Sequence, residues 1–215
     1  MKKILIVLLL LPWLSFSKDY IFEYNKNIEK EKEITKLFNA IKTKNNIYAK
    51  MLLEKKKKEN SKSYNIPWDI EKDENIDPNI KDVQGYTPVI IACMYDNLEI
   101  LEFLIKQGAN LNCSHPILGK TMLATAIAYN STKVAIYLIT HHKEMINQAS
   151  QSDGWLAIEE AVLKENKEVL LELLKNGADI RKKDKRGNNA YDLATRHGKG
   201  VIVKILRDYE LSKSK

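Results

Sequence analysis

The sequence predicts an all-α solenoid in which short helix-turn-helix units stack side by side. Four glycines recur at spacings of 34, 35 and 33 residues: Gly85, Gly119, Gly154 and Gly187. Each glycine is followed seven residues later by an alanine: Ala92, Ala126, Ala161 and Ala194. Apolar residues then return at the spacing of an amphipathic helix. A repeat of this length indicates a supersecondary unit that buries its apolar face only by stacking on its neighbours.

The composition fits one repeat array with extensions. The chain has 215 residues, 44% of them apolar, which is enough for a packed core. The net charge is +7, and most of the basic residues are lysine. Lysine recognises phosphates and bases less well than arginine, so the surplus indicates solubility first. We therefore do not expect nucleic acid as the main partner, because the chain has no base-stacking or groove-reading motif.

Residues 1–17 have the pattern of a secretory signal peptide. Two lysines precede an apolar run from Ile4 to Leu14. The run is shorter than the roughly 20 residues that a membrane-spanning helix needs. Ser15-Phe16-Ser17 then supplies small residues for cleavage after Ser17. We expect an exported chain, periplasmic or secreted. The alternative is that the segment stays uncleaved as an N-terminal anchor. Contact with a membrane is expected only through this anchor or through weak attraction of the basic residues.

The repeats resemble those of the ankyrin family. Asp82-Val83-Gln84-Gly85-Tyr86-Thr87-Pro88 is similar to the family's hairpin and helix start, and Leu104-Ile105-Lys106-Gln107-Gly108-Ala109-Asn110 to the end of its outer helix. The segment from Asp184 to Ala194 resembles a C-terminal capping repeat. The resemblance covers residues 82–210 and implies an ankyrin-repeat solenoid of about five units with short β-hairpin loops. The four units that contain the recurring glycines would span 82–114, 115–150, 151–183 and 184–210, followed by a tail at 211–215.

Helix-capping residues support these boundaries. Thr87 can cap the first inner helix, with Pro88 at its first position, where a missing N–H costs nothing. Gly108 and Gly177 suit the left-handed residue that ends an outer helix. The two middle units depart from the family pattern, because Thr121-Met122 and Leu156-Ala157 replace Thr-Pro. We expect these units to be less regular, with a longer connection near residues 142–152.

The N-terminal part is expected to hold a capping helix pair and a long loop. Within residues 18–54, apolar residues cluster from Ile34 to Ile41 and from Ile47 to Leu53. Ala40 would correspond to the first repeat alanine, but the separation exceeds one repeat. The excess falls in residues 55–81, which are rich in lysine and other polar residues. We expect a solvated loop here, with one local anchor at Pro67-Trp68.

No residue pattern indicates catalysis, a cofactor or a metal centre. His141-His142 are adjacent and face different sides of a helix, so solvated helix-end residues are the alternative to a metal site. Glu159-Glu160 are neighbours on an inner helix rather than a facing carboxylate pair. Cys93 occupies a small buried position, and the sequence leaves open whether it pairs with Cys113. We expect a protein that is not an enzyme.

The family resemblance implies that a protein partner is held by the hairpin tips and the exposed edges of the inner helices, on a concave face. Tyrosine and tryptophan, which dominate interface energetics, would line this face, unless some of them pack between repeats. The implied partner-binding residues are Val83, Gln84, Tyr86, Met94, Tyr95, Ile117, Leu118, Lys120, Tyr129, Asp153, Trp155, Lys164, Arg186 and Asn188.

Three roles remain open for a monomer of this kind. The chain could be a scaffold for a resident protein, or an exported inhibitor or effector that acts on a foreign or host protein. The third role is attachment to an anionic lipid or nucleic-acid surface through the lysine-rich loop and the basic C-terminal unit. Binding of that third kind would weaken with rising salt.

Overall fold

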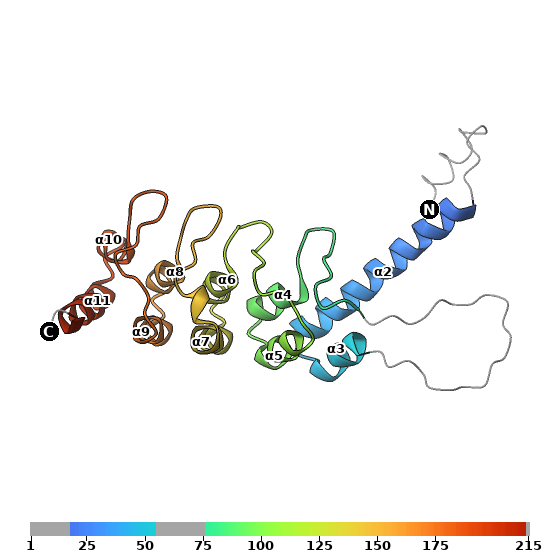
Figure 1. Cartoon of the computed structure of the whole chain (residues 1–215), viewed down its shortest axis with the longest axis horizontal. Coiled ribbons are helices and arrows are strands. Elements are labelled where there is room, and N and C mark those ends of the chain that lie inside the picture. The colour runs from blue at the N-terminus through green and yellow to red at the C-terminus, as the bar shows by residue number, and fades with distance from the viewer. Residues whose placement is uncertain (1–17, 55–75, 214–215) are drawn as a thin grey trace.

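The computed structural model describes residues 18–54 and 76–213 and shows two rows of helices with a row of hairpin loops above them (Figure 1). The inner row is α4 (Pro88–Met94), α6 (Met122–Ala128), α8 (Ala157–Leu163) and α10 (Ala190–Arg196). The outer row is α5 (Leu98–Lys106), α7 (Thr132–His141), α9 (Lys167–Lys175) and α11 (Gly200–Lys213). The all-α solenoid is therefore confirmed.

The inner helices stack closely because their facing positions are small. Each repeat alanine, from Ala92 to Ala194, is fully buried between neighbouring helices. Each inner helix packs on the next one along the array, and each also packs on its own outer helix. The core is therefore one continuous apolar layer shared by all units.

The first unit is a helix pair, α2 (Lys18–Lys42) and α3 (Asn46–Leu53). The apolar residues from Ile34 to Ile41 are buried against α3 and α4, as their spacing indicated. Helix α2 begins well before this stretch, and its N-terminal half projects beyond the array (Figure 1). The predicted signal segment lies outside the described residues. None of the helices in the described ranges is both long and apolar enough to span a membrane.

The end of the expected solvated loop belongs to the array instead. Ile76 and Ile80 pack against the core. The Asn79 side chain accepts a hydrogen bond from the Asn110 amide at 2.6 Å. Asn147 makes the same kind of bond with the Asp179 amide two units later, at 2.9 Å. Residues 76–81 therefore pack on the array just before the first hairpin. The rest of the loop, with Pro67-Trp68, lies outside the described residues.

The helix caps explain how the middle units tolerate their unusual sequences. Thr87 caps α4 through the Ile90 amide, and Thr121 caps α6 through the Ala124 amide at 3.2 Å. Leu156 has no capping oxygen at the start of α8. The Glu159 carboxylate replaces it by accepting from the Leu156 amide at 2.7 Å. The longer connection after α7 contains the short 3₁₀ helix η1 (Lys143–Met145).

Glycines end two of the outer helices, as expected. Gly108 and Gly177 follow α5 and α9 with φ angles of +83° and +93°, which confirms the left-handed ends.

Cys93 and Cys113 are both free thiols. Complete burial raises the pKa of the Cys93 thiol well above its usual range, so this thiol is a packing residue.

The hairpins differ in length, and this accounts for part of the uneven glycine spacing. The first and last are closed by amide-to-carbonyl bonds from Asp82 to Tyr86 and from Asp184 to Asn188. The second, closed from His115 to Lys120, is one residue longer, as is the third. Within the described residues, only the second hairpin contains a β-bridge, between Ser114 and Thr121. The hairpin loops are therefore turns with very little strand.

An acceptor side chain fixes the turn in each hairpin where one is available. Asp82 accepts from the Gln84 and Tyr86 amides, both at 2.9 Å. In the second hairpin, His115 takes this role: its Nδ1 accepts from the Ile117 amide at 3.3 Å and the Leu118 amide at 3.1 Å. The imidazole is only 2% exposed. Its Nε2 must therefore carry the proton and donate to the Tyr129 hydroxyl, 3.2 Å away.

This arrangement predicts how His115 links stability to pH. Burial, and then the charge of Lys120, lower the pKa of His115 below 6.5. Protonation of Nδ1 would also remove the acceptor of two amides. The stabilisation is present above pH 6.5 and is lost as the pH falls through the folded-state pKa. We expect His115→Ala to lower the free energy of unfolding by about 1–3 kcal/mol at pH 8.

Chemical denaturation at several pH values measures this effect. The difference in unfolding free energy between wild type and His115→Ala should be largest at pH 8 and should shrink below pH 6.5. A difference that stays constant from pH 8 to pH 5 would show that Nδ1 is not the acceptor that holds the turn.

Candidate interaction surface

The hairpin tips and the C-terminal ends of the inner helices form one side of the array, called the hairpin face below. Neighbouring hairpins are hydrogen-bonded to each other on this face. The Gln151 amide donates to the Gly119 carbonyl at 2.9 Å, and the Lys185 amide to the Asp153 carbonyl at 3.1 Å. The Ser152 hydroxyl donates to the Leu118 carbonyl at 2.7 Å. These bonds hold the last three tips in a fixed register.

Apolar side chains at the first two tips are turned to solvent. Val83 is 83% exposed and Ile117 is 71% exposed. Leu118 lies beside Ile117 and is partly exposed. Large apolar side chains grouped in this way usually mark a site of interaction.

Two tyrosines extend this apolar group. Tyr95 ends α4 and Tyr129 ends α6, so they occupy equivalent positions in successive units. Each is about two-fifths exposed. The Tyr129 ring also stacks over His115, with the ring centroids 5.9 Å apart. The structure therefore brings these residues to the hairpin face, as expected. Gln84 is exposed beside Val83, and Met94 is half-buried beside Tyr95.

The other two predicted aromatics, Tyr86 and Trp155, pack against residues of neighbouring units. Tyr86 is half-buried and meets the His115 ring edge-on, with the centroids 5.2 Å apart. Trp155 is half-buried, and the Lys120 ammonium lies 5.0 Å from the centroid of its ring. Less of these two side chains is open to a partner than of Tyr95 or Tyr129. The expected strip of four equivalent aromatics is thus reduced to Tyr95 and Tyr129.

Lys120 differs from its predicted role as a free contact for a partner. Its ammonium pairs with the Glu160 carboxylate of the next unit, and both side chains are largely buried. Burial raises the pKa of Glu160, while the bond to Lys120 opposes that rise. Breaking a buried pair leaves one uncompensated charge, so this contact constrains the register between two units.

Glu159 has the raised pKa that often marks catalysis, but its position is that of a structural residue. Burial, with smaller contributions from Asp184, Asp153 and Glu160, raises its pKa to about 7. The side chain is fully buried, and one carboxylate oxygen holds the start of α8. Its other oxygen, Oε1, has no hydrogen-bond partner among the described residues. Because its carboxylate is buried and bonded to the Leu156 amide at the start of the helix, Glu159 acts as a helix cap.

In the last two units, acceptors hold the turns and cations face solvent. Asp153 accepts from the Trp155 amide at 3.0 Å, and Asp184 accepts from the Arg186 and Asn188 amides. Asn188 is buried, with its amide bonded to Asp184, so it is not available to a partner as predicted. Lys164 and Arg186 are exposed, as expected.

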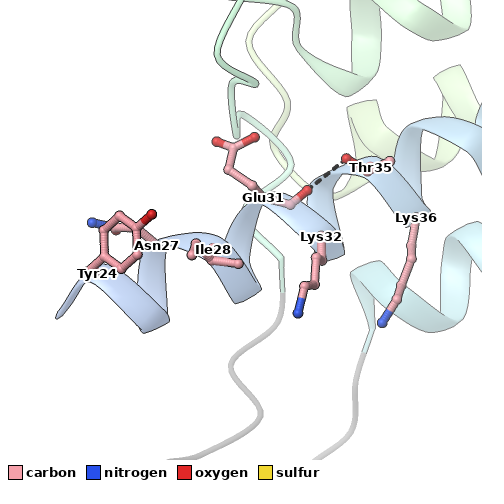
Figure 2. Close-up of a pocket in the computed structure, with 7 residues that line it drawn as sticks. All are labelled: Tyr24, Asn27, Ile28, Glu31, Lys32, Thr35 and Lys36. Carbon is pink, nitrogen blue, oxygen red and sulfur yellow. Dashed lines mark hydrogen bonds between the residues drawn. The ribbon is translucent and has the colours of Figure 1, made fainter. Parts of the chain in front are cut away.

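A depression of about 600 Å³ lies along the projecting half of α2, but it does not form a catalytic pocket. Figure 2 shows that the labelled side chains lining it all come from one helix, and the Thr35 hydroxyl among them bonds back to the Glu31 carbonyl. Within the described ranges, no group of three or more histidine, cysteine or carboxylate side chains could hold a metal. His141 stacks on Tyr137, with the ring centroids 4.4 Å apart.

Sequence reasoning missed two residues that shape this face. His115 is the acceptor of the second hairpin, and its only signal was its place at the start of that hairpin, where the first hairpin has Asp82. Glu160 is the partner of Lys120. A glutamate at a buried position of an inner helix could have indicated a cationic partner in a neighbouring unit, because buried carboxylates are rarely unpaired.

The sequence matches the family model described as ankyrin repeats (3 copies) over residues 5–114, 70–149 and 113–184. Among similar proteins, the ankyrin repeat protein FPV219 of Fowlpox virus (strain NVSL) is 33% identical over 121 residues, which are 56% of this chain and 27% of that protein. The tyrosine-protein kinase HTK16 of Hydra vulgaris is 23% identical over 137 residues, 64% of this chain and 18% of the kinase.

The ankyrin repeat protein YahD of Escherichia coli (strain K12) is 28% identical over 140 residues, 62% of this chain and 68% of that protein. The chain thus spans about a quarter or less of the fowlpox and Hydra proteins and about two thirds of the bacterial one. The family match covers most of the sequence and agrees with the stacked helix pairs, their glycine turns and their capped inner helices. The chain belongs to the ankyrin-repeat family.

Proposed function

We propose that this chain binds another protein through its hairpin face. The observation that supports the proposal best is the exposed apolar group at the first two tips, Val83, Ile117 and Leu118, with Tyr95 and Tyr129 beside it. Ankyrin repeats are in general protein–protein interaction modules. Hydrogen bonds from the second hairpin to the third limit the ordering that the Ile117-Leu118 tip would undergo on binding, which favours affinity.

The proposal extends to export of the chain. Its support is the pattern of residues 1–17, a positive start, a short apolar run and small residues before Lys18. Outside the cytoplasm, the chain would serve either as a scaffold for a resident protein or as an inhibitor or effector of a foreign one. The identity of the partner decides between these two roles.

Attachment to an anionic surface is a weaker second candidate. It would use the basic residues, whereas the most exposed apolar side chains of the hairpin face would have no role in it. Binding of this kind falls steeply between low and physiological salt, while an interface centred on apolar contacts does not.

Export predicts a shorter mature chain. If the signal peptide is cleaved after Ser17, the protein recovered from the periplasm or medium should begin at Lys18. Intact-mass measurement and N-terminal sequencing of that protein check this prediction. A full-length chain confined to the cytoplasm would contradict it.

The binding role predicts that three substitutions on the hairpin face abolish capture of the partner. In a Val83→Ser, Tyr95→Ala, Ile117→Ser variant, we expect affinity to fall by about a hundredfold or more, since anchor residues contribute at least 2 kcal/mol each. All three side chains are exposed, so the thermal unfolding midpoint should change little. Affinity capture with the full chain as bait, followed by titration with the captured protein, measures the effect.

The matched control changes three apolar residues that are more than half exposed on the outer helices α9 and α11: Leu171→Ser, Val201→Ser and Leu211→Ser. This variant should retain the partner. Equal retention by both variants would remove the hairpin face as the binding site.

A further inference from the structure

The hairpin face changes its chemistry along the array at equivalent positions. The residue that ends each inner helix is Tyr95, then Tyr129, then Lys164, then His197. The hairpin tips change in the same direction. They carry Val83-Gln84, then Ile117-Leu118, then Ser152-Asp153, then Lys185-Arg186. Because the units are structurally equivalent, these residues form an order in space. The first two tips are apolar, the third is polar and carries the Asp153 carboxylate, and the fourth carries two cations, while Lys164 at the end of α8 is the first cation along the face.

The cations at the far end of this face are open to solvent. Lys164, Lys185, Arg186 and Arg196 are all exposed. The Lys185 ammonium contacts only carbonyl oxygens of the third hairpin, and the Arg196 guanidinium contacts the Asn188 amide oxygen. Among the described residues, no carboxylate forms an ion pair with any of these four side chains. Their positive charge is therefore available to a ligand.

Four carboxylates of the last two units are already engaged or turned inward. Glu160 pairs with Lys120, and Glu165 pairs with Lys199. Asp184 is buried and accepts backbone amides of its own hairpin. The exposed Asp192 accepts the Asn189 amide at the start of α10. On the solvent side of this part of the face, the four cations therefore outnumber one half-exposed carboxylate, that of Asp153, which accepts the Trp155 amide.

We propose that the partner lays a single segment of protein chain along the hairpin face, with an apolar stretch over the first two units and an acidic stretch over the last two. This inference rests on the proposed function and adds the chemistry and the direction of the partner. Each half of the face matches one half of the segment, since apolar contacts supply affinity and complementary charge supplies steering and register. Because the order of the units is fixed, the segment can bind in only one direction.

A nucleic acid fits this face less well. Single strands are held by cations interleaved with aromatic rings on which bases stack. Here the exposed rings, Tyr95 and Tyr129, lie in the units that lack the cations. A phosphate backbone along the last two units would leave the apolar half of the face uncovered. An acidic protein segment with an apolar end uses both halves.

Selection of phage-displayed random peptides on the immobilised full chain tests the inference. We expect enriched peptides to carry aspartate and glutamate in one half and apolar residues in the other, always in the same order. A synthetic copy of an enriched peptide, titrated by fluorescence polarisation, should bind Lys164→Glu, Arg186→Glu about tenfold more weakly than wild type at low salt. The Val83→Ser, Ile117→Ser variant should also bind more weakly, with an unchanged salt dependence.

The matched control is Lys133→Glu, Lys204→Glu, which makes the same change in net charge on the outer helices α7 and α11, where both lysines are exposed. It should bind the peptide like the wild type. Peptides without acidic enrichment, or an equal effect of both charge reversals, would overturn the inference and leave the proposed function standing. Failure to select any peptide that depends on Val83 and Ile117 would count against both.

An oligothymidylate probe provides the remaining arm. Wild type should bind it at least tenfold more weakly than the enriched peptide at physiological salt, because only half of the face would contact it. Tighter binding of the oligonucleotide than of any peptide, lost in Lys164→Glu, Arg186→Glu, would assign the cations to nucleic acid and overturn the inference.

Discussion

No unit of this protein can bury its own apolar face, and the rest of the structure depends on that constraint. Two short helices leave apolar surface uncovered, so each unit is stable only against its neighbours. The fully buried alanines of the inner helices make the close approach possible. Once the inner helices are stacked, the hairpins that precede them are brought side by side and hydrogen-bond to one another. The hairpin face is thus a consequence of the packing of the core.

Buried polar groups then fix details that apolar packing leaves free. A side-chain acceptor holds each turn for which one is present, and its chemistry differs from unit to unit: aspartate in the first and last, the His115 imidazole in the second. The Lys120–Glu160 pair links the second and third units at one register. We therefore expect the geometry of the second hairpin to respond to pH, and this hairpin also carries Ile117 and Leu118, near the centre of the apolar group.

The fold could be predicted from the sequence because the repeat has a strong period and its special positions have physical reasons. The four glycines all have positive φ angles, Thr87 caps its helix, and the repeat alanines are buried. The site was predicted less well. Equivalence between repeats indicates which positions face outward on average, but the exposure of one side chain depends on its neighbours. Asn188 is buried because it bonds to Asp184, and Lys120 is engaged because the next unit supplies Glu160. Such pairings cross between units and cannot be derived from the period alone.

The central claim is that the partner lies on the hairpin face, and site-specific photo-crosslinking tests it most directly. A benzophenone amino acid placed at Ile117, on a hairpin tip, is compared with the same group at Leu171, on the outer helix α9; both side chains are more than half exposed. We expect a covalent adduct with the partner at Ile117 and none at Leu171. An adduct at Leu171 without one at Ile117 would place the partner on the outer helices and contradict the account.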